Sequence, residues 1–209
     1  MRILIADDHA VVRRGLKQIL ADEFKQAHFG EAANAREALD RLRKENWDAV
    51  VLDITMPGRS GLEALKEIRE EKPKLPVLVL SMHPEDQFAV RVLKSGASGY
   101  MTKESAPEEL VGAIKKVLAG GRYVSPSLAE KMASYLALDT PKAPHERLSD
   151  REFVVLRMIA SGKTVSQIAE ELSLSVKTVS TYRTRILEKM GMTSNAELTH
   201  YAIKNQLVE

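Results

Sequence analysis

The sequence predicts an α/β domain with a doubly wound, five-stranded parallel sheet, joined by a helical linker to an all-α domain of four helices. In residues 1–120, short apolar runs alternate with helical patterns, as in a parallel sheet covered by helices on both faces. After Gly120-Gly121 the strand signals stop, and from Leu148 onward the pattern is purely helical. These two observations predict two domains of different class.

Short apolar runs mark the strands of the first domain, and the central runs are rich in β-branched residues. The predicted strands are Ile3–Ala6, the weaker Ala27–Gly30, Ala49–Leu52, Val77–Leu80 and Gly99–Met101. Between them, apolar residues recur three or four positions apart, which predicts the helices Val11–Leu20, Ala35–Leu42, Leu62–Ile68, Phe88–Leu93 and Leu110–Leu118. Ser105 and Glu108 have the spacing of a capping box ahead of the last helix.

The linker and the second domain are read from their helix start and stop signals. Ser125-Pro126 predicts the start of one further helix, about 126–138, and the proline-containing segment 139–145 has no apolar periodicity. Four helices follow, at about 150–161, 165–171, 176–190 and 195–206, with capping-box pairs Ser149/Glu152, Thr164/Gln167 and Ser194/Glu197, and with Gly162 and Gly191 at C-terminal caps. The predicted bounds are therefore 1–120 for the first domain, 121–146 for the linker and 147–209 for the second domain.

Composition and charge exclude several classes of protein. The chain is 44% hydrophobic and 29% charged, as in a soluble globular protein, and it has no run as long as a membrane span and no signal-peptide pattern. We therefore expect a cytoplasmic protein without a membrane partner. The absence of cysteine excludes disulfides, thiolate metal sites and cysteine nucleophiles. The net charge of +2 comes entirely from the second domain, the end that a phosphate backbone would prefer.

Chemically active side chains follow the predicted strands. Asp7 and Asp8 follow the first strand, Asp53 the third, Ser81 the fourth and Lys103 the fifth. The carboxyl ends of parallel strands share one edge of the sheet, so these side chains should converge there. Clustered carboxylates need a cation, and oxygen ligands in a small cleft suit Mg²⁺. An aspartate in such a place can accept a phosphoryl group as an acyl phosphate, with lysine and hydroxyl groups offsetting charge on the transferred oxygens.

Four motifs resemble the receiver domain of bacterial two-component response regulators. They are Asp7-Asp8, Asp53-Ile-Thr-Met-Pro-Gly58, Ser81-Met-His83 and Tyr100-Met-Thr-Lys103. The resemblance spans residues 1–120 and implies a flavodoxin-like fold, with Asp53 as the phospho-acceptor. It also implies that Asp7, Asp8, Asp53 and the backbone carbonyl of Thr55 hold Mg²⁺, Asp7 largely through water. Ser81, Tyr100 and Lys103 would then stabilise the phosphoryl group and transmit the switch.

One position departs from the receiver pattern, and two others are candidates for tuning it. Many receivers place proline after the lysine, whereas Glu104 follows Lys103 here, so the loop lacks a fixed X-Pro geometry. Thr55 and His83 occupy the positions that tune phosphoryl lifetime in similar proteins. The histidines His9, His28, His83, His145 and His200 show no metal-ligand spacing, which indicates surface or packing roles.

The predicted helix 176–190 is basic and amphipathic. Val176, Val179, Ile186, Leu187 and Met190 are expected to face the core of the second domain. Lys177, Ser180, Thr181, Thr184 and Arg185 lie largely on the other side, where short side chains let a helix approach the major groove. With the helix before it, this segment forms a helix-turn-helix pattern, which predicts binding to double-stranded DNA.

Three motifs in the second domain resemble the LuxR-type output domain. They are Leu148-Ser-Asp-Arg-Glu152, Lys163-Thr-Val-Ser-Gln-Ile-Ala-Glu170 and Ser175-Val-Lys-Thr-Val-Ser180. With the receiver, the architecture resembles a response regulator of the NarL/FixJ type. The resemblance places Ser180, Thr181 and Thr184 nearest the bases, and Lys177, Arg183 and Arg185 near phosphates. It implies a sensor histidine kinase as phosphodonor, and a homodimer that forms on phosphorylation, with the last helix serving dimerisation.

Three alternatives remain at this stage. A phosphatase of the haloacid dehalogenase kind also uses an aspartate nucleophile with Mg²⁺, but it carries an Asp-x-Asp signature, whereas this chain has Asp7-Asp8-His9. A constitutive DNA-binding protein could keep a vestigial receiver, although the acceptor set is complete. Finally, a three-helix unit can mediate protein contacts instead of DNA binding.

Overall fold

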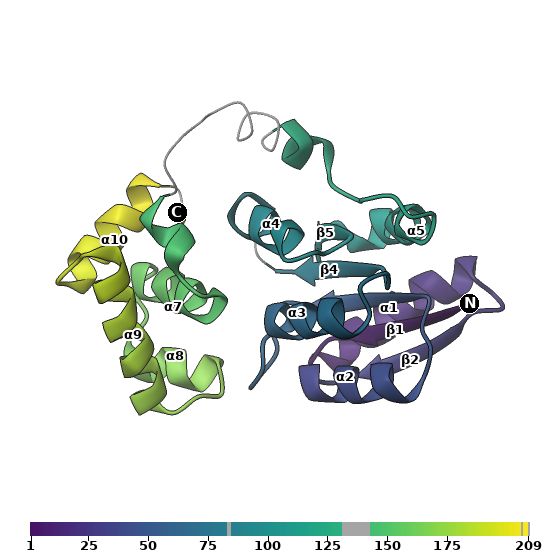
Figure 1. The fold of residues 1–209 in the computed structure, drawn as a ribbon, viewed down its shortest axis with the longest axis horizontal. Helices are drawn as coiled ribbons and strands as arrows, with labels where there is room; N and C mark the ends of the chain where they lie inside the picture. Colours follow the sequence, from purple (N-terminus) through teal and green to yellow (C-terminus); the bar gives the residue numbers. More distant parts are fainter. Residues whose placement is uncertain (83–84, 131–142, 206, 209) are drawn as a thin grey trace. The chain divides into compact units, whose positions relative to one another are not determined.

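The computed structural model describes residues 1–82, 85–130, 143–205 and 207–208, which form two compact units, 1–138 and 139–209 (Figure 1). In the first unit the strands are β1 (Arg2–Ala6), β2 (His28–Ala32), β3 (Ala49–Asp53), β4 (Val77–Ser81) and β5 (Gly99–Thr102). Its helices are α1 (Ala10–Glu23), α2 (Ala35–Lys44), α3 (Gly61–Glu71), α4 (Glu85–Lys94) and α5 (Ala106–Leu118).

The five strands form one sheet in the order β2-β1-β3-β4-β5, and every neighbouring pair is parallel. The predicted doubly wound sheet is therefore confirmed. The chain adds β2 on one side of β1 and then crosses to place β3 on the other side. This reversal brings the carboxyl ends of β1 and β3 next to each other, which is where open α/β sheets form their functional crevice.

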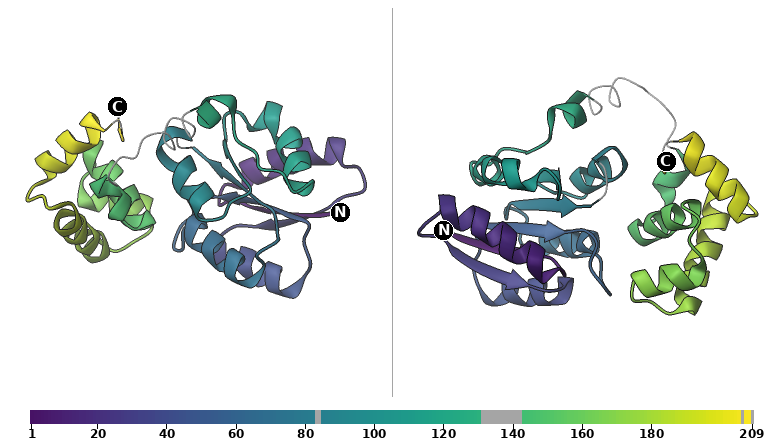
Figure 2. Two further views of the ribbon diagram at one scale, coloured as in Figure 1. Left: turned by 45° about the horizontal axis from the view of Figure 1, so that its top comes forward. Right: turned by 180° about the vertical axis from the view of Figure 1, so that it is seen from behind.

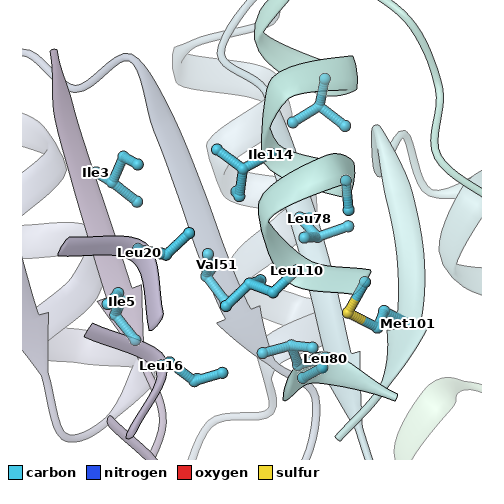
Figure 3. Packing of buried hydrophobic residues seen from close by; sticks show 13 residues of the cluster. Ile3, Ile5, Leu16, Leu20, Val51, Leu78, Leu80, Met101, Leu110 and Ile114 are labelled. Carbon is cyan, nitrogen blue, oxygen red and sulfur yellow. The ribbon is translucent and has the colours of Figure 1, made fainter. Parts of the chain in front are cut away.

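Side chains of alternate strand residues fill the two faces of the sheet. On one face, Ile3, Ile5 and Val51 pack with residues of α1 and α5, such as Leu20 and Leu110 (Figure 3). Helices α2, α3 and α4 cover the opposite face, as the views of Figures 1 and 2 show. Because both faces are covered, β3 and β4 are buried along their whole length, which explains their continuous apolar sequence.

Strand β2 extends two residues past its predicted end, to Ala32 instead of Gly30. It pairs with β1 from Arg2 opposite His28 to Ala6 opposite Ala32. Gly30 lies beneath Trp47, and a Cβ atom at this position would come within 2.1 Å of the indole ring. The glycine therefore lies inside the strand, where the aromatic ring approaches the backbone, and does not end it.

The predicted capping box at Ser105 is wrong. Ser105 has a helical backbone conformation, and its side chain makes no cap hydrogen bond. Its hydroxyl group instead lies within hydrogen-bonding distance of the Thr102 side chain and carbonyl group, at 3.2 and 3.3 Å. A residue that has already entered the helix cannot direct its side chain back to the free N–H groups of the first turn.

The second unit contains a short 3₁₀ helix η1 (Pro144–Arg147) and the helices α7 (Asp150–Ala160), α8 (Val165–Glu171), α9 (Val176–Met190) and α10 (Asn195–Lys204). The four predicted helices are confirmed, as are the capping boxes of α7 and α8. At α10, Ser194 accepts from the Glu197 N–H group, but the Glu197 carboxylate accepts from Thr193 instead of completing the box. Gly162 and Gly191 have positive φ angles of 83° and 66°, as expected at helix C-termini.

Two further predictions concern the linker and membrane insertion. Residues 126–130 are helical, and the remainder of the predicted helix 126–138 lies outside the described residues. In the part of the chain that the structure describes, no helix combines the length and the apolar character needed to cross a bilayer.

The first turn of α3 packs directly on the end of β3, and this contact gives a test of the fold. A Cβ atom at Gly61 would lie 1.8 Å from the carbonyl oxygen of Asp53, so Gly61→Ala must displace backbone. We expect it to lower the free energy of unfolding by roughly 1–3 kcal/mol. Gly112→Ala, in the exposed middle of α5 with nothing within 4 Å, should instead raise it by about 0.5–1 kcal/mol. Urea denaturation would measure both, and equal effects would contradict the packing argument.

Candidate functional site

The carboxyl ends of β1, β3 and β5 bring three charged side chains together. Lys103 Nζ lies 2.8 Å from Asp53 Oδ2 and 2.6 Å from Asp7 Oδ2. Asp7 and Asp53 are each 1% exposed, and the Lys103 side chain is 8% exposed. The convergence expected from the strand ends is therefore present, and it links residues 46 and 50 positions apart in sequence.

Backbone groups hold the two buried carboxylates in place. The N–H group of His9 donates to Asp7 Oδ1 at 2.8 Å, and the N–H group of Thr55 donates to Asp53 Oδ1 at 3.1 Å. Arg13 on α1 donates to the carbonyl oxygen of Asp7 at 2.6 Å. Arg13 had no role in the sequence analysis, because an arginine on a predicted helix gives no signal of which carbonyl group it will reach.

The electrostatic balance of the cluster leaves Asp53 poorly compensated. Burial raises the pKa of Asp53, Lys103 and the Thr55 N–H group lower it, and Asp7 raises it, with a net value of about 6. Burial lowers the pKa of Lys103, but Asp53 and Asp7 raise it by more, so it ends above its ordinary value. A single ammonium group therefore does not compensate the buried carboxylates, and a second cation would stabilise their charged forms.

The residues present fit a divalent cation. Asp7, Asp8, His9 and Asp53 each offer one ligand atom, and these four atoms lie within 4.8 Å of one another. Among the described residues, Asp8 Oδ1 is buried and accepts no hydrogen bond. Three carboxylates beside one lysine leave two excess negative charges, which one divalent ion would neutralise. The donor set is mainly oxygen, as Mg²⁺ prefers.

The other expected members of the site lie at the ends of the same strands. Ser81 ends β4 and is fully buried, and its carbonyl group accepts from the Lys103 N–H group at 2.8 Å. Tyr100 on β5 is also fully buried. Thr55 is exposed immediately beyond β3, and His83 lies outside the described residues. The structure thus places Ser81 beside the Lys103 backbone and leaves the roles of these residues as proposals.

In the second unit, α8 and α9 are joined by a tight turn. Ser173 has a positive φ of 52°, and the N–H group of Leu174 donates to the Ala169 carbonyl group at 2.8 Å. Ser175 then caps α9 by accepting from the Thr178 N–H group at 3.0 Å. The predicted helix-turn-helix is therefore present, with two helices held at a fixed turn.

The cations of α9 fall into two groups: some bind other residues of the domain, and the others project outward. The exposed predicted DNA-contact residues are Lys177, Ser180, Thr181, Thr184 and Arg185. Arg183 is half-buried and donates to Asn195 Oδ1 at 2.6 Å, and Lys189 Nζ lies 2.6 Å from the buried Glu152 carboxylate. Arg183 and Lys189 therefore stabilise the domain internally, and Lys177 and Arg185 carry the outward charge of α9.

Hydrogen bonds outweigh burial in setting the pKa of Glu152. Burial raises the pKa of Glu152, but hydrogen bonds from Lys189 and from the Ser149 cap lower it by more, and it ends below its ordinary value.

One core prediction for α9 is wrong: Val176 is 52% exposed. It is the first residue of α9, whereas Val179 and Ile186 further along the helix are fully buried. Periodicity alone cannot show where a helix extends past its neighbours.

A hollow of about 330 Å³ lies along α9. Its lining residues are Ser175, Lys177, Thr178, Thr181, Tyr182 and Arg185. Ser175, Thr178 and Tyr182 were not among the predicted contact residues, although their hydroxyl groups beside two cations are suited to phosphate oxygens. The sequence signal for them was the spacing of hydroxyl residues around Lys177 and Arg185.

Comparison with known proteins places these two sites in a family. Residues 3–115 match the model of the response regulator receiver domain, and residues 146–202 match that of bacterial regulatory proteins of the luxR family. The chain belongs to the two-component response regulators. Within this family it is of the NarL/FixJ type, a transcription regulator with a LuxR-type helix-turn-helix and not an enzyme, so the phosphatase alternative is rejected.

Relatives and solved structures match this response regulator over nearly its whole length. It is 37% identical to the response regulator UvrY of Escherichia coli K12, over 99% of this chain and 95% of UvrY. It is 39% identical to the response regulator GacA of Pseudomonas aeruginosa, over 100% of this chain and 98% of GacA. The structure of RcsB from Salmonella enterica serovar Typhimurium, bound to the rprA promoter with the phosphomimetic BeF₃⁻, is similar with a TM-score of 0.64, 28% identity and coverage of 96% and 98%.

The buried position of Asp53 predicts a pH-dependent cost to the metal-free protein. The pKa of Asp53 is about 6 in the folded chain, above the ordinary 3.8. The contribution of the protonated carboxyl group to the free energy of unfolding is therefore full below pH 3.8 and is lost as pH rises through about 6. Asp53→Asn should therefore become more stable than the parent chain as pH rises, by on the order of 3 kcal/mol between about pH 4 and pH 7.

Denaturant unfolding in the presence of a chelator would measure this difference at each pH. Asp40→Asn, on the exposed side of α2, controls for the loss of a carboxylate from the surface. A difference between Asp53→Asn and the parent chain that does not change with pH would contradict the burial argument.

Proposed function

We propose that Asp53 accepts a phosphoryl group from a sensor histidine kinase, and that this event promotes homodimerisation and binding to double-stranded DNA. The carrying observation is the buried contact of Asp53 Oδ2 with Lys103 Nζ at 2.8 Å, beside Asp7 and Asp8. The proposal includes domain bounds of 1–120, 121–146 and 147–209, and a cytoplasmic location.

In the proposed transfer, a carboxylate oxygen of Asp53 attacks phosphorus. A bond forms between that oxygen and phosphorus, the bond from phosphorus to the donor breaks, and the donor leaves with the electron pair. Lys103 would offset negative charge on the transferred oxygens, and the Ser81 hydroxyl group would donate to one of them.

Asp7, Asp8, Asp53 and the carbonyl group of Thr55 would hold Mg²⁺ at this site. When bound, the ion would offset the negative charge of the carboxylates and of the phosphoryl oxygens. The support is the excess of negative charge around Asp53 and the close approach of ligand atoms from Asp7, Asp8 and Asp53, which lie within 4.8 Å of one another.

The switch would act as a shift between two populations. Phosphorylation adds charge and oxygen acceptors beside Lys103, whose N–H group is bonded to the Ser81 carbonyl group. Ser81 and Tyr100 are buried on adjacent strands, so their rearrangement requires neighbouring side chains to repack. The phosphorylated chain would then favour a form competent for dimerisation, in which α10 contributes contacts.

For DNA binding, α9 would enter the major groove. Ser180, Thr181 and Thr184 are exposed, and short side chains permit close approach to base edges. The hydroxyl groups of Thr181 and Thr184 donate to carbonyl groups of their own helix, at 3.0 and 3.2 Å, which leaves their oxygens as acceptors for base donors. Lys177 and Arg185 would contact phosphates, and the paired Arg183 would exchange its Asn195 contact for a phosphate.

Substitution of the acceptor tests the switch. Asp53→Ala should abolish the gain in DNA affinity and the rise in dimer fraction that a small phosphodonor with Mg²⁺ causes in the parent chain. Electrophoretic mobility and analytical ultracentrifugation would measure the two effects, with intact mass to count phosphoryl groups. Asp40→Asn, remote from the cluster, should respond as the parent chain does.

Two results would contradict the proposal. If Asp53→Ala still gains a phosphoryl group and DNA affinity, the acceptor is assigned to the wrong residue. If the parent chain takes up no phosphoryl group and binds DNA equally well with and without the phosphodonor, the receiver is vestigial and the protein is constitutive.

The exposed cations of α9 give a separate prediction. Lys177→Ala and Arg185→Ala should each weaken DNA binding on all sequences and reduce the slope of log affinity against log salt by about 1, because each removes one phosphate contact. Lys25→Ala, in the exposed turn before β2, removes the same charge from the first domain and should leave the slope unchanged. Fluorescence anisotropy over a salt series would measure the slopes, and equal slopes in all three variants would refute the phosphate assignment.

A further inference from the structure

His9 lies beside the acceptor cluster and has no part in the proposed function. It follows Asp8 directly, at the N-terminal cap of α1, and its side chain is 64% exposed. The imidazole Nδ1 lies 2.9 Å from Asp8 Oδ1 and 3.4 Å from Asp7 Oδ1. A nitrogen donor therefore stands at the mouth of a cluster that otherwise offers only oxygens.

His9 Nδ1 lies within hydrogen-bonding distance of Asp8, 2.9 Å from its Oδ1. A neutral imidazole that carries its proton on Nε2 would present the Nδ1 lone pair to an ion shared with that oxygen. Neighbouring donor atoms around a small cation each lie roughly 2.1 Å from the ion and about 3 Å from one another. The distances of 2.9 and 3.4 Å thus match the spacing of donor atoms around one shared ion.

The remaining ligand distances extend this match. The atoms that Asp7, Asp8, His9 and Asp53 offer all lie within 4.8 Å of one another, so one ion can reach all four after small side-chain movements. The backbone N–H group of His9 donates to Asp7 Oδ1. This hydrogen bond holds His9 next to Asp7, which would be another ligand of the same ion. In a neutral imidazole Nε2 can keep the proton while Nδ1 binds a metal, and the His9 side chain is 64% exposed.

We propose that His9 Nδ1 is a metal ligand that gives the acceptor cluster a preference for borderline transition-metal ions, such as Co²⁺ and Zn²⁺, over Mg²⁺. The inference rests on the metal site of the proposed function and adds a residue and a selectivity to it. Imidazole nitrogen favours the later divalent metals, whereas Mg²⁺ prefers oxygen ligands and keeps its waters. Since both ions use Asp8 and Asp53, they compete for one place.

The test titrates the full-length chain, without a histidine tag, with Co²⁺ and with Mg²⁺. Calorimetry gives both affinities, and the visible absorption of Co²⁺ reports nitrogen coordination. His9→Asn, which keeps the backbone N–H bond to Asp7, should weaken Co²⁺ binding by at least about tenfold, the loss typical even of residues that only support metal ligands. Its Mg²⁺ affinity should stay near that of the parent chain.

His28→Asn is the matched control, because this exposed histidine begins β2 at the opposite end of the sheet and packs against Trp47. It should bind Co²⁺ and Mg²⁺ as the parent chain does. If His9→Asn keeps the parent's Co²⁺ affinity and spectrum, or if the parent binds Co²⁺ no more tightly than Mg²⁺, the role of His9 is overturned while the Mg²⁺ site stands. If the parent chain binds neither ion, both the inference and the metal site of the proposed function fail.

Discussion

The first domain depends on one electrostatic constraint, the burial of Asp7 and Asp53 against the single ammonium group of Lys103. Two carboxylates that are each 1% exposed repel one another and lose their hydration, and one cation beside them offsets only part of that cost. The raised pKa of Asp53 is the measurable sign of this imbalance. A site that is undercompensated in this way is suited to take up a cation, because binding relieves the repulsion.

The fold maintains this imbalance through the order of its strands. Because β1 and β3 are neighbours, their terminal acids meet, and β5 delivers Lys103 across the end of β4. Gly61 lets the first turn of α3 approach the Asp53 carbonyl group, so the backbone at Asp53 is closely packed. The apolar layers on both faces of the sheet therefore hold the charged edge in a rigid frame.

In the second domain, contacts between neighbouring helices decide which cations of α9 remain available to a ligand. Glu152 caps α7 and also binds Lys189, and Asn195 at the start of α10 binds Arg183. These contacts join α9 to its neighbours and leave Lys177 and Arg185 on the outer side. The helix is thus anchored by one set of cations and presents another, which agrees with a recognition helix that must keep a fixed orientation.

The sequence by itself determined the five-stranded sheet, the four C-terminal helices and the meeting of Asp7, Asp53 and Lys103 at one edge, because periodicity, capping residues and strand ends are local signals. It failed where the outcome depended on residues far along the chain. The role of Ser105 was decided by its helical backbone and its contacts with Thr102, and the exposure of Val176 by what packs against the start of α9. The contacts of His9 and Arg13 with Asp7 are local in sequence. By contrast, the distances of 2.8 and 2.6 Å from Lys103 to Asp53 and Asp7 arose only when β1, β3 and β5 packed, since proximity across a sheet edge is a tertiary property.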